Sequence, residues 1–359
     1  MSQINRKSEK FLFQYLNNTS PTGYESSGQK IWTDYINDYV DEWHLDNYGT
    51  AYGVINPGMD YRVVIEAHAD EISWFVNYIS DNGMIYVVRN GGSGHVIAPS
   101  MRVHVHTRNG IIPGVFGWPA IHTRHGKNAN LSPTLENITV DVGAKDKEEV
   151  LKMDIHVGCV ITFQDELVKL NDRYYCGRAL DNRMGGFCIA EVARLLHTNK
   201  KKLPFSLYIV NSVQEEIGLR GAEMIANTIK PHVAIITDVT HDTSTPLIDN
   251  KIQGDTQCGL GPVLTYAPAV HNLLLQQVID VAEKNNIKFQ RAAASRSTGT
   301  DTDAFAYSNG GVPSVLISLP LRYMHTTVEM AHQQDIEGVM TLIYETLLTI
   351  HSGQSFKYF

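Results

Sequence analysis

The 359-residue sequence predicts an α/β fold in which a mixed sheet carries helices on both faces and a small β-domain is inserted. Two observations lead to this prediction. After about residue 168, apolar strand-like runs alternate with helical ones, which is the pattern of an α/β sheet. Between residues 73 and 167, short β-rich runs alternate with Gly, Asn and Pro, and helical periodicity is nearly absent.

The first 72 residues predict two helices and the first strands of the α/β domain. Residues 6–40 divide into two helical segments separated by the turn sequence Ser20–Gly23. A strand pair follows around a turn at Asn47–Thr50, and Arg62–Ala67 has the composition of a buried strand. The second helix carries an apolar stripe at roughly helical spacing, formed by Ile31, Trp32, Tyr35, Ile36 and Val40.

Residues 73–167 predict a small β-barrel that interrupts the α/β domain, which itself comprises residues 1–72 and 168–359. The strand-like runs of the insert include Ile85–Val88, Met101–His106 and Gly110–Gly117, and a short helix is expected at Lys147–Met153. Short strand-like runs separated by turn residues are typical of a barrel or a sandwich.

The rest of the chain predicts strands and helices in alternation, which implies a sheet with helices on both faces. The expected strands are 205–213, 233–237 and 314–318. The expected helices are 182–197, 220–229, 272–285, 302–308 and 334–351.

The bulk composition excludes several classes of partner. The formal net charge is −8 and basic residues are dispersed, which argues against nucleic acid or an anionic membrane as the main ligand. We expect no secretory signal, because the first residues are polar, and no run approaches membrane-spanning length. The four cysteines lack zinc-like spacing, so free thiols in a reducing cytoplasm are expected.

Side chains of the metal-ligand type follow the ends of the predicted strands. His68 ends the first strand, Glu215 and Glu216 follow the second, Asp238 follows the third, and His325 follows the fourth. A further carboxylate lies at the start of a helix, in Leu180–Asp181–Asn182. Each position taken alone would fit a helix cap or a salt bridge. Because active sites of open α/β sheets form beyond the carboxyl ends of the strands, we expect all five segments to meet.

Two histidines and three carboxylates suit a pair of divalent ions such as Zn²⁺, Co²⁺ or Mn²⁺. A pair of this kind needs one bridging carboxylate. Two acids are then left over. Asp70 can orient the imidazole of His68 two residues away, and Glu215 can accept a proton from a metal-activated water and pass it to the leaving group.

Several stretches together carry a family resemblance, and they span most of the chain in one order. They are Ala67–Ile72, Gly177–Arg183, Gln214–Ala222, Asp238–His241, Gly299–Asp301 and Pro320–Thr326. In these motifs the chain resembles the M42 metallo-aminopeptidases, the group of glutamyl aminopeptidases, TET peptidases and deblocking aminopeptidases. The segment Ser297–Phe305 departs from the commonest form of its motif, which concerns the substrate pocket rather than the ligand set.

The resemblance implies a zinc-peptidase domain with an inserted PDZ-like domain, and removal of N-terminal residues from peptides. It implies two metal ions per subunit with Asp181 as the bridge, and we expect these ions to be Zn²⁺. His68 would bind a different ion from Glu216, and Asp238 a different ion from His325. Glu215 would be the general acid and base. Family members often assemble into tetrahedral dodecamers, so a homo-oligomer is expected.

Two other classes of function compete with this reading. An endoglucanase-type glycoside hydrolase would use two carboxylates without metal. A peptide-binding scaffold without catalysis would be expected to have lost its ligands, whereas all of them are present. The preferred N-terminal residue, whether acidic, aliphatic or blocked, does not follow from the sequence.

Overall fold

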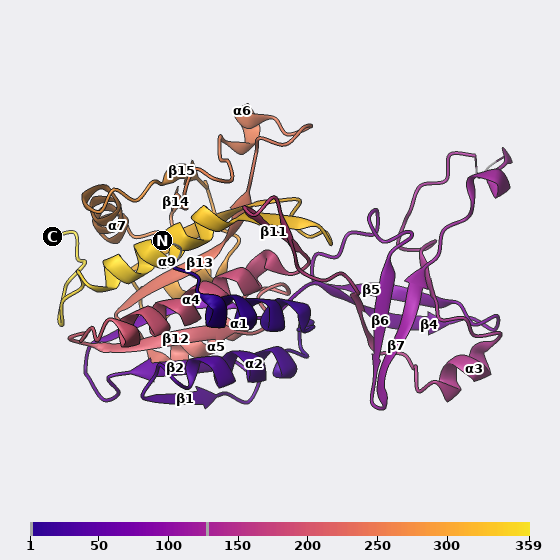
Figure 1. The fold of residues 1–359 in the computed structure, drawn as a ribbon, viewed down its shortest axis with the longest axis horizontal. Coiled ribbons are helices and arrows are strands. Elements are labelled where there is room, and N and C mark those ends of the chain that lie inside the picture. The colour runs from indigo at the N-terminus through magenta and orange to yellow at the C-terminus, as the bar shows by residue number, and fades with distance from the viewer. Residues whose placement is uncertain (1–2, 127–128) are drawn as a thin grey trace.

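The computed structural model describes residues 3–126 and 129–359. Within them, a mixed α/β domain stands beside a small β-barrel (Figure 1). The mixed α/β architecture predicted from the sequence is therefore confirmed. None of the helices in this described part of the chain is long and apolar enough to cross a membrane.

The centre of the α/β sheet is a set of four parallel strands in the order β12 (Ser206–Ser212), β3 (Arg62–His68), β13 (Val233–His241) and β16 (Ser314–Arg322). Their residues are almost entirely buried, since both faces of the sheet are covered. The four carboxyl ends therefore meet at one edge, as the strand-end argument requires.

Antiparallel strands extend this parallel centre on both sides and make the sheet mixed. On one side lie β2 (Ala51–Ile55) and β1 (Glu42–Leu45). On the other lie β17 (Glu329–His332), β11 (Tyr174–Gly177) and β10 (Val168–Leu170). The strand β14 (Val263–Tyr266) also pairs with β16 and carries β15 (Gln290–Ala293).

Hydrogen bonds at the end of β12 show that helices cover opposite faces of the sheet. Asn211 bonds to Tyr15 and Gln29, which lie on α1 (Arg6–Asn17) and α2 (Ser26–Ile36). The next residue, Ser212, bonds to Asp301 on α8 (Asp301–Ala306). Because successive strand residues point to opposite faces, α8 lies on the other side from α1 and α2.

The other helices complete the two layers. α4 (Leu180–Thr198) packs on β3 and contacts α1, α2 and α9 (Gln333–Leu347), while α5 (Arg220–Ile229) packs against α8. α7 (Asn272–Lys284) lies against α9, and the short α6 (Asn250–Gln253) stands out from the sheet (Figure 1).

Six strands of the described chain close into a barrel in the order β4, β5, β8, β7, β6 and β9. The barrel has its own apolar cluster, centred on Trp74, Phe116 and Phe163, apart from the large cluster of the α/β domain. Its short helices are η1 (Ile121–Thr123) and α3 (Lys147–Lys152). Its strands are β4 (Ser73–Ile79), β5 (Ile85–Asn90), β6 (Arg102–Thr107), β7 (Gly110–Phe116), β8 (Thr139–Asp141) and β9 (Val160–Phe163).

The structure corrects the sequence prediction at the edges of the sheet. The strands β10, β11, β14, β15 and β17, with three or four residues each, were not expected. Such short strands give too few positions for an alternation pattern to be detected. Two central strands are longer than predicted, because β13 continues to His241 and β16 to Arg322. Asp238 therefore lies inside β13 rather than after it.

Candidate metal centre

The predicted ligands meet at the carboxyl edge of the sheet. His68 ends β3, Asp238 lies near the end of β13, and His325 follows β16. Glu215 and Glu216 lie in the loop after β12, and Asp181 is in the first turn of α4. That turn is irregular, with non-helical backbone angles at Asp181. The structure thus brings together side chains that are up to 257 positions apart in the sequence.

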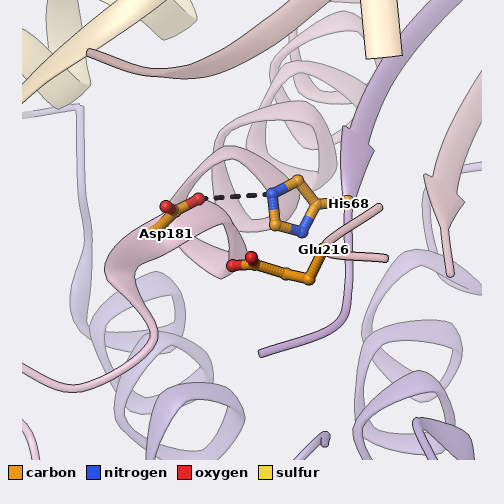
Figure 2. A group of neighbouring side chains, drawn as sticks. All are labelled: His68, Asp181 and Glu216. Carbon is orange, nitrogen blue, oxygen red and sulfur yellow. Dashed lines mark ion pairs between the residues drawn. The ribbon is translucent and has the colours of Figure 1, made fainter. Parts of the chain in front are cut away.

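Asp181 lies between the two histidines. Its Oδ1 is 3.2 Å from Nε2 of His68, and its Oδ2 is 3.2 Å from Nε2 of His325. Figure 2 shows the Asp181 carboxylate facing the His68 ring, with Glu216 beside it. One carboxylate with each oxygen toward a different imidazole is the arrangement that a bridging ligand needs.

The two glutamates and Asp238 fill the space around these three residues. Glu216 Oε1 lies 3.5 Å from His325 Nε2. Asp238 Oδ1 and Glu215 Oε2 each lie 3.8 Å from His68 Nε2. Among the described residues, two groups of three have all their ligand atoms within 4.8 Å of one another: His68, Asp181 and Glu216, and His68, Glu215 and Asp238.

These side chains fit divalent metal ions. In a tetrahedral zinc site, with ligand bonds of about 2.0–2.2 Å, neighbouring ligand atoms lie about 3.3–3.6 Å apart, close to the distances observed here. Glu216 Oε1 is buried and contacts His325 only at the long distance of 3.5 Å. A buried carboxylate oxygen with so weak a partner is unfavourable unless a cation is bound to it.

The electrostatics of the cluster also indicate a need for cations. Burial, reinforced by Asp238, Asp301 and Glu216, raises the pKa of Glu215 to about 10 although His68 opposes the shift. Burial likewise raises the pKa of Asp238. Asp181 is the exception. Burial alone would raise its pKa, but hydrogen bonds from His325 and His68 lower it.

Asp70 connects His68 to the loop that carries both glutamates. Its Oδ1 lies 3.3 Å from Nδ1 of His68, and it is completely buried. The same carboxylate accepts hydrogen bonds from the backbone N–H groups of Glu215 (3.0 Å) and Glu216 (3.2 Å), and from the Thr22 hydroxyl (2.9 Å). Asp70 is therefore placed to fix the orientation of the imidazole and the position of the loop together.

Glu329 makes similar backbone contacts at Asp181 and His325, and sequence reasoning missed it. Its buried carboxylate accepts hydrogen bonds from the backbone N–H groups of Leu180 (2.8 Å), Asp181 (3.2 Å) and His325 (2.7 Å). The residue lies on β17, one of the short strands that the sequence did not predict, so no pattern singled it out.

Glu66 and Asp301 form a second buried acidic pair, which was not predicted as part of the site although Asp301 lies in the motif Gly299–Asp301. The Ser212 hydroxyl lies 2.6 Å from Glu66 Oε1 and 2.8 Å from Asp301 Oδ2. Burial raises the pKa of both carboxyl groups. The sequence did contain a signal for Glu66, because a glutamate stands inside the apolar strand Val63–Ala67.

Metal binding to this cluster should release protons and become tighter as pH rises. Without metal ions, hydrogen bonds to Asp181 and Glu216 raise the pKa of His325 to about 11, so its imidazole is protonated at pH 7. A ligand must lose this proton before it binds metal. Between pH 6 and pH 9 the imidazole is still mostly protonated, so each bound Zn²⁺ must displace a proton. The Zn²⁺ affinity should therefore increase by about tenfold per pH unit for each proton released.

Calorimetry of Zn²⁺ binding in two buffers with different ionisation enthalpies counts the protons released. An affinity that does not change with pH, together with no proton release, would contradict the assignment of His325 as a ligand.

Comparison with known proteins identifies the family. A sequence model described as M42 glutamyl aminopeptidase matches residues 49–342. A lysyl aminopeptidase of Pyrococcus furiosus is 32% identical over 89% of this chain and 91% of its own. A glutamyl aminopeptidase of Lactococcus lactis is 29% identical over 81% of each chain.

Solved structures agree with the sequence comparison. The TET aminopeptidase of a marine-sediment archaeon of the Thaumarchaeota superposes with a TM-score of 0.91 and 26% identity, covering 97% of this chain and 98% of that one. A structure of PhTET1, described as a dodecamer, gives a TM-score of 0.84 and 27% identity over 96% and 100% of the two chains. The chain belongs to the M42 family of aminopeptidases, and it is a peptidase.

Proposed function

We propose that this aminopeptidase uses two divalent metal ions, with Asp181 bridging them. The observation that carries the proposal is the placement of one Asp181 oxygen against His68 and the other against His325. The ion-pair distances favour Asp238 as the partner of His68, and Glu216 as the partner of His325. This division agrees with the pairing implied by the family resemblance, although His68 is also near Glu216 and Glu215.

Glu215 is proposed as the residue that moves the proton. It stands at the edge of the cavity, 3.8 Å from His68, and it is held by a backbone bond to Asp70. Two bound divalent ions would polarise the scissile carbonyl and acidify a water molecule. The Glu215 carboxylate would accept the proton from that water and donate it to the departing amine. Asp70 and Glu329 keep the surrounding side chains in position through their backbone bonds.

The substrate is proposed to be a peptide with its N-terminal residue in the cavity above the cluster. The cavity has a volume of about 680 Å³, which accommodates a single amino-acid side chain and the adjoining peptide bond. The names of relatives include both lysyl and glutamyl aminopeptidases, so the family accommodates N-terminal residues of opposite charge.

We further propose Zn²⁺ as the physiological metal, with Co²⁺ or Mn²⁺ as substitutes, and a cytoplasmic location. Four free, buried cysteines support a reducing compartment. Residues 1–72 and 168–359 are proposed as the catalytic domain and residues 73–167 as a PDZ-like insert. Pyrococcus horikoshii TET1 is described as assembling into a tetrahedron or an octahedral shell. A homo-oligomer of the 40.1 kDa chain is expected by analogy, and light scattering would measure its mass.

Chelation tests the proposed chemistry. Exhaustive treatment with EDTA should abolish hydrolysis of a panel of aminoacyl-p-nitroanilides, and Zn²⁺, Co²⁺ or Mn²⁺ should restore it, because the buried carboxylates cannot act without cations. Hydrolysis of the panel at an unchanged rate after EDTA treatment would refute the metal mechanism. The glycoside hydrolase alternative, which the family match does not favour, predicts an EDTA-resistant activity on glucans.

A further inference from the structure

The loop before α8 forms part of the lining of the proposed substrate cavity. Ser297, Thr298, Gly299 and Thr300 line the cavity, together with Asp303 from the first turn of α8. This loop is the segment whose sequence departs from the commonest form of its motif. Leu219, Val239 and Met324 add apolar side chains to the lining, and Thr240 and His241 add polar ones.

Asp303 is held rigidly through one of its two carboxylate oxygens. Its Oδ2 accepts hydrogen bonds from the backbone N–H of Thr298 (2.9 Å), the Thr298 hydroxyl (3.0 Å) and the backbone N–H of Gly299 (3.2 Å). Its Oδ1 is covered and has no hydrogen-bond partner. In the described part of the chain, the ion pairs at this cavity join His68 or His325 to neighbouring carboxylates, and none includes Asp303.

Charge counting shows why Asp303 matters to a substrate. Besides Asp303, four acidic side chains line the cavity, namely Asp181, Glu215, Glu216 and Asp238. When ionised they carry four negative charges, which the two proposed divalent ions would cancel. The Asp303 charge is then not balanced by the cluster. In a cleft of reduced dielectric, a carboxylate attracts a cation and repels an anion across several ångströms.

We propose that Asp303 makes this cavity prefer a basic N-terminal residue, lysine or arginine, over an acidic one. The proposal rests on the proposed function, since it places the first side chain of the peptide in this cavity. A cationic side chain gains the attraction of the unbalanced carboxylate, whereas glutamate or aspartate is repelled. A neutral side chain of similar length should be bound with an affinity between those of the basic and the acidic side chains.

The substitution Asp303→Asn separates charge from loop structure. The amide oxygen of asparagine can still accept the hydrogen bonds from Thr298 and Gly299, so the loop should keep its shape. The negative charge is removed. Asp280→Asn is the matched control, because Asp280 is exposed on α7, outside the cavity lining.

The assay compares kcat/KM for lysyl-, leucyl- and glutamyl-p-nitroanilide at pH 8. The native enzyme should prefer the lysyl substrate to the glutamyl substrate. Asp303→Asn should lower the lysyl-to-leucyl ratio by roughly five- to tenfold and raise the glutamyl-to-leucyl ratio. The control variant should keep the native ratios. Added salt should reduce the lysyl preference of the native enzyme and not that of Asp303→Asn.

A binding measurement makes the test independent of turnover. Calorimetry should show that L-lysine binds the native protein more tightly than L-norleucine, and that Asp303→Asn removes this difference. Unchanged substrate ratios and unchanged lysine binding in Asp303→Asn would overturn the proposal and leave Asp303 with a purely structural role. If the native protein hydrolyses none of the aminoacyl-p-nitroanilides, the proposed function itself is refuted.

Discussion

Replacing Glu215 with glutamine should lower kcat by about 10²–10⁴-fold while leaving both metal ions bound. The amide has nearly the same size as the carboxylate, but it cannot accept a proton from water. Its backbone N–H still donates to Asp70, so the loop should remain in place. The measurement is steady-state turnover on an aminoacyl-p-nitroanilide, combined with metal content by mass spectrometry.

The adjacent residue provides the matched control. Glu216→Gln differs by one position and makes the same chemical change, yet it removes a carboxylate whose buried oxygen lies 3.5 Å from His325. It should weaken metal binding, whereas Glu215→Gln should not. Near-normal turnover of metal-loaded Glu215→Gln would refute its role as acid and base. Loss of a metal from Glu215→Gln would assign that residue to the ligands instead, a possibility raised by its closeness to His68 and Asp238.

The substitution Asp181→Asn should weaken the binding of both metal ions and abolish activity. Asp181 is the carboxylate that faces both His68 and His325, and an amide offers one oxygen and no charge. Changes in groups that merely orient ligands reduce metal affinity by about 10–100-fold, so loss of a bridging ligand should exceed about 100-fold. Competition with a chromophoric chelator measures both affinities.

A thermal readout accompanies this prediction. Zn²⁺ should raise the unfolding temperature of the native protein, because an ion that binds only the folded state stabilises it. Asp181→Asn should lose most of that increase. Asp172→Asn is the control, since Asp172 is exposed in the turn between β10 and β11, where asparagine tolerates the local positive φ. Two ions bound to Asp181→Asn with native affinity would contradict the bridging role.

The sequence alone was sufficient to predict the mixed α/β architecture, the run of short strands in residues 73–167 and the candidate ligands. The central strands are long and almost entirely buried, and their apolar stretches are visible in the sequence as continuous runs. Because parallel strands bring their carboxyl ends to one edge, the residues after these runs could be assigned to a common site before their distances were known. His68, Glu216 and Asp238 were predicted as ligands in this way.

The tertiary structure decided what depends on contacts between distant segments. Glu329 holds Asp181 and His325 from a four-residue strand, and so short a strand leaves no periodic signal. Asp303 acquires its place beside the substrate cavity only when α8 packs against the sheet. The physical reason is the same in both cases. A local sequence pattern reports which face of an element is buried, whereas the partner of a carboxylate is set by packing between elements that are remote in the chain.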